Sequence, residues 1–291
     1  MTRQGIAAIV LTKNEEGDLP ACLDSIEGLA DAIFVIDSGS TDRTTEIAVS
    51  RGAKVLTHPF FNYASQFNWA LENISGREEW ILRIDADERV SPELADSIRR
   101  KLSTVDAEVT GILVPRLTFF LGRKIRHGET YPVWLLRFFR RGVGRCEETW
   151  MDEHIVLDKG TTVKVRGDLL HEIPKSLSEW VRKHDWYADR ECKDILGVSG
   201  SPSDLTGQPG VRRALKQGIY LRFPMFARAF LYWFYRYFLK FGFLDGKEGL
   251  IYHFLQGFWY RFLVDAKLYE LKQAASVPSS TAGIQSRQLP E

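Results

Sequence analysis

The sequence predicts an α/β fold: a doubly wound, mostly parallel sheet with helices on both faces. Three continuous apolar runs have the length and branching of strands that are buried on both sides, at residues 6–11, 32–36 and 80–84. Segments with apolar residues at helical spacing separate these runs, and such alternation is typical of a parallel sheet. A polar cluster follows each run, and ligands of these sheets lie beyond the carboxyl ends of the strands.

The N-terminal third therefore alternates strands and helices. Strands are expected at 6–11, 32–36, 53–56 and 80–84. Helices are expected at 19–26, 42–50, 62–74 and 91–102, where apolar side chains recur every three or four residues.

The pattern then becomes strand-like, before one long helical segment. Strands are expected at 109–115, 119–125 and 135–140, and a helix at 176–196. Residues 197–210 are rich in Gly, Ser and Pro, which predicts a flexible linker.

Aromatic residues are concentrated beyond this linker: 18 of the chain's 36 lie between Tyr220 and Phe262. Arg228, Tyr232, Arg236 and Lys240 recur every four residues and form one helical stripe. The pattern predicts basic amphipathic helices within 211–273 that lie in a membrane interface. A helical hairpin packed on the rest of the chain, or a dimer interface, is the alternative. The polar tail, 274–291, is expected to be disordered.

The overall composition excludes several classes of protein. A net charge of +1 gives no global field that would attract nucleic acid. Three widely spaced cysteines, Cys22, Cys146 and Cys192, support neither a disulfide framework nor a zinc site, and each is expected to be a small buried apolar residue. No signal peptide is recognised, and no apolar run approaches the roughly 20 residues that a membrane span needs.

Asp85 and Asp87 follow the apolar run 80–84 with one residue between them. Residues i and i+2 of a strand point to the same side, so the two carboxylates can converge. Such a pair needs a cation, and Mg²⁺ or Mn²⁺ with open positions for phosphate oxygens fits oxygen ligands. A strand end that runs into an ordinary polar turn is the alternative.

Two more polar clusters follow the first two strands. Asp37 can accept hydrogen bonds from a base or from ribose, and Ser38 begins a tight turn with exposed N–H groups. Thr12 and Glu15 can reach the same nucleotide from the neighbouring strand. The alternative for 37–42 is a plain turn in which Asp42 or Ser40 caps a helix. The fingerprints GxGxxG and GxxxxGK[ST] are absent, which argues against dinucleotide and P-loop sites.

Together these clusters resemble family 2 glycosyltransferases of the GT-A fold. The resemblance rests on Leu11-Thr12-Lys13-Asn14-Glu15-Glu16, on 35–44 (Val-Ile-Asp-Ser-Gly-Ser-Thr-Asp-Arg-Thr) and on Asp85-Ala86-Asp87. It implies a set of contacts to the donor nucleotide and sugar: Thr12, Asn14, Glu15, Asp37, Ser38, Gln66, Asp85 and Ala86. It also implies that Asp85 and Asp87 form the metal-binding DxD motif, with His171 as a weaker metal candidate.

Residues 62–71 resemble the bacterial lipopolysaccharide-core glucosyltransferases within that family. Many relatives carry a basic residue near position 66, where this chain has Gln66. In the acceptor half, the cationic segments 126–129 and 137–141 suit a phosphorylated acceptor, or else they form a solvated loop and an edge strand.

A glycosyltransferase of this kind needs a general base for the acceptor hydroxyl. The family supplies it from an acidic pair, and Asp152 and Glu153 occupy the matching place. Asp152 is favoured, and a simple charged loop is the alternative.

The sequence thus predicts an inverting, metal-dependent hexosyltransferase with a nucleotide-diphosphate sugar as donor, UDP-sugar favoured. The absence of QxxRW predicts a single sugar per encounter. The acceptor is expected to be a lipid-linked saccharide at the cytoplasmic face of a bacterial inner membrane. Alternatives are a sugar nucleotidyltransferase and a membrane-associated binding protein with a degenerate site. The expected units are a catalytic domain at 1–196, with a donor half at 1–103 and an acceptor half at 104–196, and the helices at 211–273.

Overall fold

The computed structural model describes residues 4–147, 154–173, 176–196 and 222–276 of the 291-residue chain. The strands are β1 (Ile6–Thr12), β2 (Ala32–Asp37), β3 (Lys54–Thr57), β4 (Trp80–Asp85), β5 (Glu88–Val90), β6 (Val109–Phe120), β7 (Arg123–Ile125), β8 (Val133–Arg140), β9 (Gly144–Cys146), β10 (Ile155–Leu157), β11 (Thr161–Lys164) and β12 (Leu169–Glu172). The helices are α1 (Leu19–Ile26), α2 (Thr44–Ser50), α3 (Tyr63–Asn73), α4 (Pro92–Leu102), α5 (Leu177–Ile195), α7 (Ala227–Phe234), η1 (Tyr235–Leu239), η2 (Gly242–Asp245), α8 (Gly246–His253), η3 (Phe254–Trp259) and α9 (Tyr260–Ser276).

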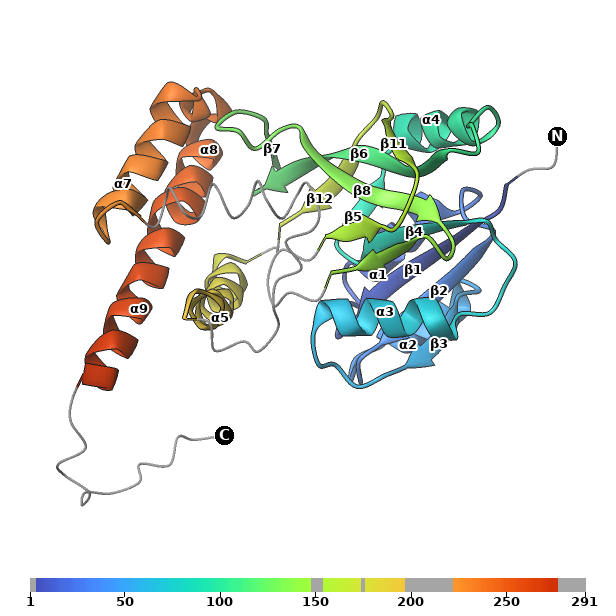
Figure 1. The fold of residues 1–291 in the computed structure, drawn as a ribbon, viewed down its shortest axis with the longest axis horizontal. Coiled ribbons are helices and arrows are strands. Elements are labelled where there is room, and N and C mark those ends of the chain that lie inside the picture. The colour runs from blue at the N-terminus through green and yellow to red at the C-terminus, as the bar shows by residue number, and fades with distance from the viewer. Residues whose placement is uncertain (1–3, 148–153, 174–175, 197–221, 277–291) are drawn as a thin grey trace, which may run out of the picture.

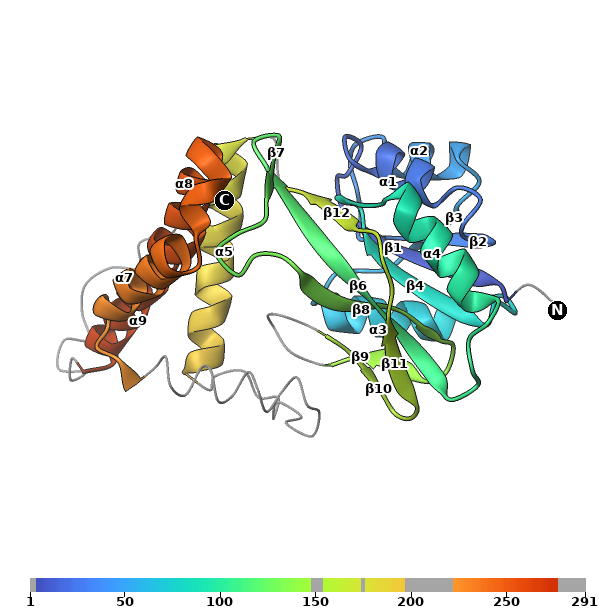
Figure 2. The ribbon, with the colours of Figure 1, turned by 90° about the horizontal axis from the view of Figure 1, so that it is seen from above.

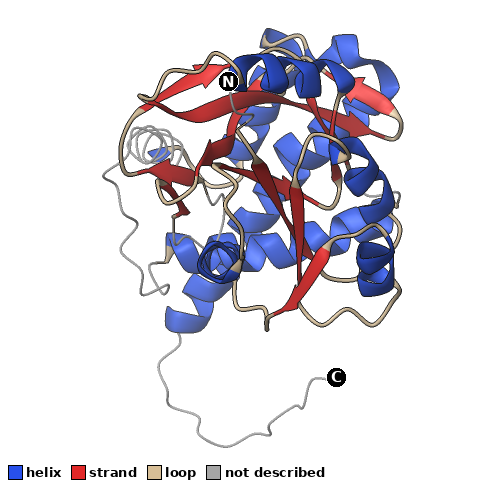
Figure 3. Ribbon diagram, turned by 90° about the vertical axis from the view of Figure 1, so that its right-hand side faces the viewer, coloured by secondary structure: helices blue, strands red, loops and turns tan. Residues whose placement is uncertain are grey.

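One sheet joins both halves of the catalytic region, in the order β3-β2-β1-β4-β8-β6-β12-β5. The first four strands are parallel, and β8 runs antiparallel between β4 and β6. The predicted α/β sheet with helices on both sides is confirmed (Figures 1 and 3).

Alternate side chains of β1 explain why its sequence is continuously apolar. Ile6, Ala8 and Val10 pack in the cluster that holds the buried faces of α1 and α4. Ala7 and Ile9 point the other way and pack against α3. Both faces of this strand are therefore covered, which is the arrangement that an apolar run without alternation predicts.

The acceptor half differs from the expectation at residues 115–125. A break was expected after Pro115, but β6 continues to Phe120 and then reverses into β7 through Leu121 and Gly122, which have positive φ of 50° and 77°. Pro115 is tolerated because it falls between the segment of β6 that pairs with β11, ending at Leu113, and the segment that pairs with β12, beginning at Arg116. A missing N–H therefore leaves no ladder bond unmade on that side.

The C-terminal helices stand at one end of the molecule, with α5 between them and the β1–β4 half (Figures 1 and 2). The expected basic stripe does not face outward. Arg228 and Arg236 are buried, and Arg228 pairs with the buried Asp265. Among the residues that the structure describes, no helix combines the length and apolar content needed to cross a membrane.

The exposed side of these helices is apolar. Fifteen of the twenty-two exposed large hydrophobic residues in the described part of the chain lie between Phe223 and Leu271. We call the following group the apolar surface: Phe230, Leu231, Phe234, Phe238, Leu239, Phe241, Phe243, Leu244, Leu250, Ile251, Phe254 and Phe262.

A buried carboxylate joins these helices to the sheet. Asp245 accepts a hydrogen bond from His127 Nδ1 at 2.6 Å and from the backbone N–H groups of Arg126 and His127. Arg236 donates to the Gly128 carbonyl at 2.7 Å and to the Thr130 hydroxyl at 2.9 Å. The alternative prediction, a helical pair packed on the rest of the protein, is thus confirmed for one face of the helices, while none of the described segments covers the apolar surface.

Two predicted segments, the linker and the tail, lie wholly or mostly outside the described residues. The predicted linker at 197–210 lies outside them, as does most of the predicted tail, although α9 continues to Ser276 rather than ending before Ala274. All three cysteines are buried and free, as predicted.

Candidate active site

The ends of β2, β1 and β4 bring the three polar clusters to one edge of the sheet. Thr12 lies opposite Asp37 in the β1–β2 pair, and Leu11 lies opposite Asp85 in the β1–β4 pair. Neighbouring strands are about 4.8 Å apart, so the ends of β2 and β4 are separated by about 10 Å. The predicted convergence of these clusters is therefore present.

Asp37 builds the loop that follows β2. Its Oδ2 accepts the N–H groups of Gly39 and Ser40, both at 2.9 Å, and its Oδ1 accepts the Ser40 hydroxyl at 2.5 Å. Thr12 donates to the same Oδ1 at 3.3 Å. The carboxylate is only 2% exposed, so it shapes the nucleotide side of the site, and its predicted direct contact with a base or ribose stays a prediction.

Asn14 and Glu15 join the first loop to the second. Asn14, in a left-handed conformation, accepts the Thr41 N–H at 2.8 Å through Oδ1. The Glu15 N–H donates to the Thr44 hydroxyl at 2.7 Å. The predicted N-cap role of Asp42 or Ser40 is not found, because α2 begins at Thr44 with Arg43 as its N-cap. Asp42 lies one residue earlier and accepts the Thr44 N–H.

Gln66 differs from its expected role as a donor contact. It is fully buried, and its Nε2 donates to the Ser38 hydroxyl and to the His58 carbonyl, both at 3.1 Å. A buried side chain with these partners cannot touch a ligand, so Gln66 acts on the site only by holding Ser38. Ala86 is likewise buried in the core, which leaves only its backbone available to a donor.

The two aspartates of the β4 end have different surroundings. Arg137, buried on β8, donates to Asp85 Oδ2 at 2.9 Å and to Glu88 Oε1 at 2.5 Å. Burial alone would raise the pKa of Asp85, but the charges of Arg137 and Arg83 hold it well below its usual range. Asp85 therefore has a protein cation as its partner, which weakens the expectation that it is a metal ligand and leaves that role mainly to Asp87.

Asp87 lies beside His171, with Oδ2 and Nε2 3.5 Å apart. Register explains this proximity, because β12 pairs with β5 and places His171 opposite Glu88. Burial raises the pKa of Asp87, but the contact with His171 outweighs burial, and the net pKa is lowered. The weaker sequence candidate, His171, thus lies next to Asp87.

This pair fits a magnesium or manganese site that the donor completes. No cluster of three or more His, Cys, Asp or Glu ligands occurs in the part of the chain that the structure describes. Mg²⁺ is commonly held by one or two protein ligands, with substrate phosphates and waters in the other positions. A carboxylate and an imidazole at one edge of the site match that pattern.

Negative charge accumulates around this pair. Burial and the charge of Asp87 raise the pKa of Glu15 to about 7. Burial is the larger cause and the repulsion by Asp87 the second, and perturbed carboxylates of this kind are typical of functional sites. A divalent cation would relieve the repulsion.

Lys183 on α5 supplies a cation to the same place, which the sequence did not reveal. Loss of solvent around the Lys183 ammonium group disfavours its charged form. The negative charges of Asp87, Glu15 and Asp85 outweigh this effect and raise the pKa of Lys183 above that of a free lysine. Lys183, Tyr187 and Arg190 are spaced i, i+4 and i+7 and share one face of α5. That face turns toward the donor half, because the Arg190 guanidinium lies 6.0 Å from the centre of the Phe60 ring.

The cationic segment 137–141 does not serve an acceptor, contrary to one expectation. Arg137 is buried against Asp85 and Glu88. Arg140 and Arg141 pair with Glu79 and Glu78, at the opposite end of β4 from the aspartates. The expected base candidates, Asp152 and Glu153, lie outside the described residues. The strands that flank them are fixed, with Cys146 of β9 opposite Ile155 of β10.

Polar loops at one edge of a parallel sheet, beside an acidic pair, are the arrangement expected of an enzyme that binds its ligand at this edge. The model of glycosyl transferase family 2 matches residues 7–152, and the chain belongs to this family. It is a glycosyltransferase of the GT-A type of fold.

Its relatives are bacterial. A glycosyltransferase of Rickettsia bellii is 28% identical over 283 residues, covering 91% of this chain and 86% of the relative. The lipopolysaccharide core biosynthesis glycosyltransferase LpsC of Rhizobium meliloti is 31% identical over 189 residues, covering 63% of this chain and 68% of the relative.

Among solved structures, glucosyl-3-phosphoglycerate synthase from Mycobacterium tuberculosis, in complex with Mn²⁺, UDP and glucosyl-3-phosphoglycerate, aligns with 40% of this chain and 44% of its own. The identity is 25% and the TM-score is 0.33, an extent of similarity that transfers no ligand or residue role to this chain.

Proposed function

We propose that the protein transfers one sugar from a nucleotide-diphosphate sugar, UDP-sugar favoured, to a lipid-linked saccharide, with inversion at the anomeric carbon. The observation that carries this proposal is the Asp87–His171 pair at the shared edge of β1, β2 and β4. Asp87 and His171 would hold Mg²⁺ or Mn²⁺, with Asp85 next to them. The metal, when bound, supplies positive charge to the leaving diphosphate.

The protein side chains have separate roles in binding the donor and activating the acceptor. Thr12, Asp37 and Ser38 shape the nucleotide side, and Gln66 fixes Ser38 from behind. Lys183 adds a second positive charge for the diphosphate, in place of the basic residue that many relatives carry near position 66. Asp152 or Glu153 takes the proton of the acceptor hydroxyl as general base, as the family resemblance implies. A single displacement of this kind inverts the anomeric carbon.

Binding calorimetry with UDP tests the donor site. UDP should bind the wild-type protein in the presence of Mn²⁺ and much more weakly without it. Asp87→Asn and His171→Ala should each weaken Mn²⁺-dependent binding and lower kcat at least about a hundredfold, because a metal ion contributes several kcal/mol to the transition state. Undiminished turnover of Asp87→Asn would overturn the metal assignment. Circular dichroism checks that both variants stay folded.

The released product separates this proposal from the alternative enzyme. A glycosyltransferase releases a nucleoside diphosphate, whereas a sugar nucleotidyltransferase releases pyrophosphate. A panel of nucleotide sugars, scored by protection against thermal unfolding, would identify the donor, because a ligand that binds only the folded state raises its melting temperature.

We also propose that the apolar surface docks on the cytoplasmic face of a bacterial inner membrane. Its support is the exposure of Phe230, Phe234 and Phe238 along one side of α7 and η1, since monomeric proteins rarely expose large contiguous apolar patches. The similarity to LpsC is consistent with a lipopolysaccharide acceptor at that membrane.

Vesicle sedimentation tests this docking. Phe234→Ser/Phe238→Ser should weaken partition onto phosphatidylcholine vesicles by roughly tenfold per ring, since each ring buries apolar area in the interface. Val49→Ser, an exposed apolar residue on α2, serves as the control and should leave partition unchanged. Equal partition of all three proteins would remove the docking proposal.

A further inference from the structure

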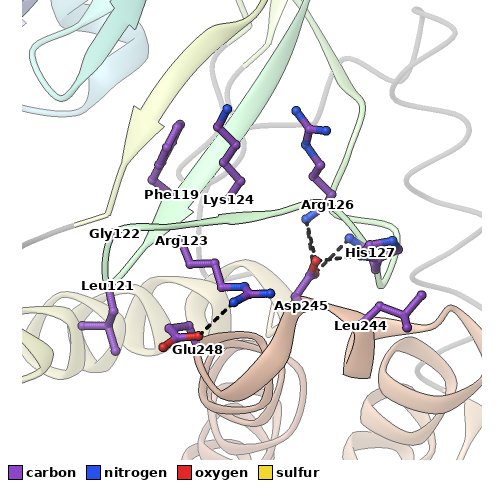
Figure 4. Close-up of a pocket in the computed structure, with 10 residues that line it drawn as sticks. All are labelled: Phe119, Leu121, Gly122, Arg123, Lys124, Arg126, His127, Leu244, Asp245 and Glu248. Atoms are coloured by element: carbon purple, nitrogen blue, oxygen red, sulfur yellow. Dashed lines mark hydrogen bonds and ion pairs between the residues drawn. The ribbon is translucent and has the colours of Figure 1, made fainter.

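A cationic hollow lies between the β6–β7 hairpin and the start of α8 (Figure 4). Its volume is about 720 Å³. This cationic hollow is lined by Phe119, Leu121, Gly122, Arg123, Lys124, Arg126, His127, Leu244, Asp245 and Glu248.

Two of the cationic side chains that line the hollow have no acidic partner among the described residues. His127 is bound to Asp245, and Arg123 lies 3.8 Å from Glu248. Lys124 and Arg126 have no carboxylate within 4 Å among the described residues, and each rests only near an aromatic ring, Phe119 and Tyr131 respectively. Figure 4 shows both side chains extending to the same side of the hairpin, away from the Arg123–Glu248 pair.

The hollow also has an apolar rim that continues into the apolar surface. Leu121 and Leu244 line it and are 47% and 54% exposed. Phe243 adjoins Leu244 in η2 and is itself exposed. Lys124 and Arg126 line the same hollow as Leu121 and Leu244, although Figure 4 shows them on the other side of β7. Cations combined with exposed apolar side chains are typical of a surface that meets the phosphates of an anionic membrane.

Strand register relates the hollow to the proposed metal pair, with the side chains of Lys124 and His171 on opposite faces of the sheet. His171 of β12 lies opposite Thr118 of β6, which in turn lies opposite Ile125 of β7. The next row joins Glu172, Phe119 and Lys124 in the same way. Two strand spacings amount to about 10 Å, so the backbone at Lys124 lies about that far from the backbone at Glu172, the residue after His171.

We propose that the cationic hollow binds the phosphate of an anionic membrane lipid through Lys124 and Arg126, with Leu121 and Leu244 against the lipid's apolar part. This proposal rests on the membrane docking proposed above and names the residues that would bind the lipid headgroup. The bound headgroup would hold the donor edge next to the membrane surface, where a lipid-linked acceptor presents its saccharide.

The test uses the full chain and two kinds of vesicle, phosphatidylcholine alone and phosphatidylcholine in which about a third of the lipid is phosphatidylglycerol. Lys124→Ala/Arg126→Ala should weaken partition onto the anionic vesicles about 25-fold, since each cation near an anionic surface contributes roughly a factor of five. Partition onto the neutral vesicles should not change. The substitutions leave the backbone bond from Arg126 to Asp245 intact.

Two further variants separate a specific site from diffuse attraction. Lys101→Ala/Lys159→Ala removes the same charge elsewhere and should weaken anionic partition by no more than about threefold at moderate salt, where distant charges are screened. Lys124→Arg/Arg126→Lys keeps both charges and should retain most of the binding. The proposal is overturned if the hollow and control variants weaken partition equally, or if the wild type does not prefer the anionic vesicles.

The donor site gives an independent readout. Mn²⁺-dependent UDP binding should be the same in the hollow variant and the wild type, because Lys124 and Arg126 are not among the residues assigned to the donor. Lost UDP binding in the hollow variant would show a damaged fold rather than a lost lipid site. Absent UDP binding in the wild type would count against the proposed donor site and leave the vesicle result to decide this inference.

Discussion

Replacement of Arg137 by Met should destabilise the protein more than any exposed charge deletion. Arg137 is 6% exposed and bonds two carboxylates, Asp85 and the almost fully buried Glu88. Removing one partner of a buried ion pair costs about 3–5 kcal/mol, because the other charge stays buried without compensation. For a domain of this size that free energy lowers the melting temperature by about 6–20 °C.

The assay is thermal and denaturant unfolding at neutral pH, with Arg99→Met as a matched control. Arg99 also pairs with a carboxylate, that of Asp96, but both side chains are about half exposed. Such a pair is worth about 0–1 kcal/mol, so the control should unfold close to the wild type. A similar loss of stability in both variants would refute the claim that burial makes the Arg137 pair costly to break.

A double variant tests the mechanism further. Burial already raises the pKa of Glu88 despite the opposing charge of Arg137, so without Arg137 this carboxyl should bind a proton more readily still. Arg137→Met should therefore regain stability as the pH falls, because the folded state then binds more protons than the unfolded state. Arg137→Met/Glu88→Gln should recover part of the loss at neutral pH, and purely additive effects would contradict the pairing.

Two more predictions concern the acidic edge. Lys183→Met should raise the Kd for UDP with Mn²⁺ about tenfold or more, whereas Lys159→Met on the β10–β11 turn should not change it, since only Lys183 senses the charges of Asp87 and Glu15. Equal affinity in both variants, measured by calorimetry, would exclude Lys183 from the diphosphate site. The pKa of Glu15 is raised from 4.5 to about 7, so the wild type loses stability as the pH rises through this range, because the unfolded chain ionises this carboxyl first. Glu15→Gln should therefore melt higher than the wild type at about pH 8, and the difference should be much smaller at about pH 5. Melting curves at the two pH values check the sign, and an equal difference at both would contradict it.

The sequence predicted the donor half well because its signals are local. The apolar runs of β1, β2 and β4 and the turn chemistry at Asp37 depend on neighbours in the chain. The three strand ends are far apart in sequence, but parallel topology alone brings them together. The sequence alone was thus enough to assign Thr12, Asp37 and Asp85 to one edge of the sheet.

Features set by tertiary packing were missed. Arg137 was taken for an acceptor contact, because the antiparallel register of β8 against β4 is invisible in a cationic pattern. Lys183 lies in a segment that shows only helical periodicity, and its role depends on where α5 packs. Arg228 and Arg236 have the spacing of an exposed basic face, yet both are buried. Arg228 pairs with Asp265, and Arg236 donates a hydrogen bond to the Gly128 carbonyl. A helical pattern reports which residues share a face, and only the rest of the fold decides where that face points.

The Asp245 anchor has a geometric consequence for acceptor choice. Because Asp245 and Arg236 bond the 126–130 loop directly to the C-terminal helices, the distance from those helices to the ends of β1, β2 and β4 is set by packing rather than by a hinge. If the apolar surface docks on a bilayer as proposed, this fixed distance sets the height of the donor site above the membrane. A saccharide chain of one length would bring its terminal hydroxyl level with the donor carbon, while shorter chains would fall below it and longer ones would overshoot.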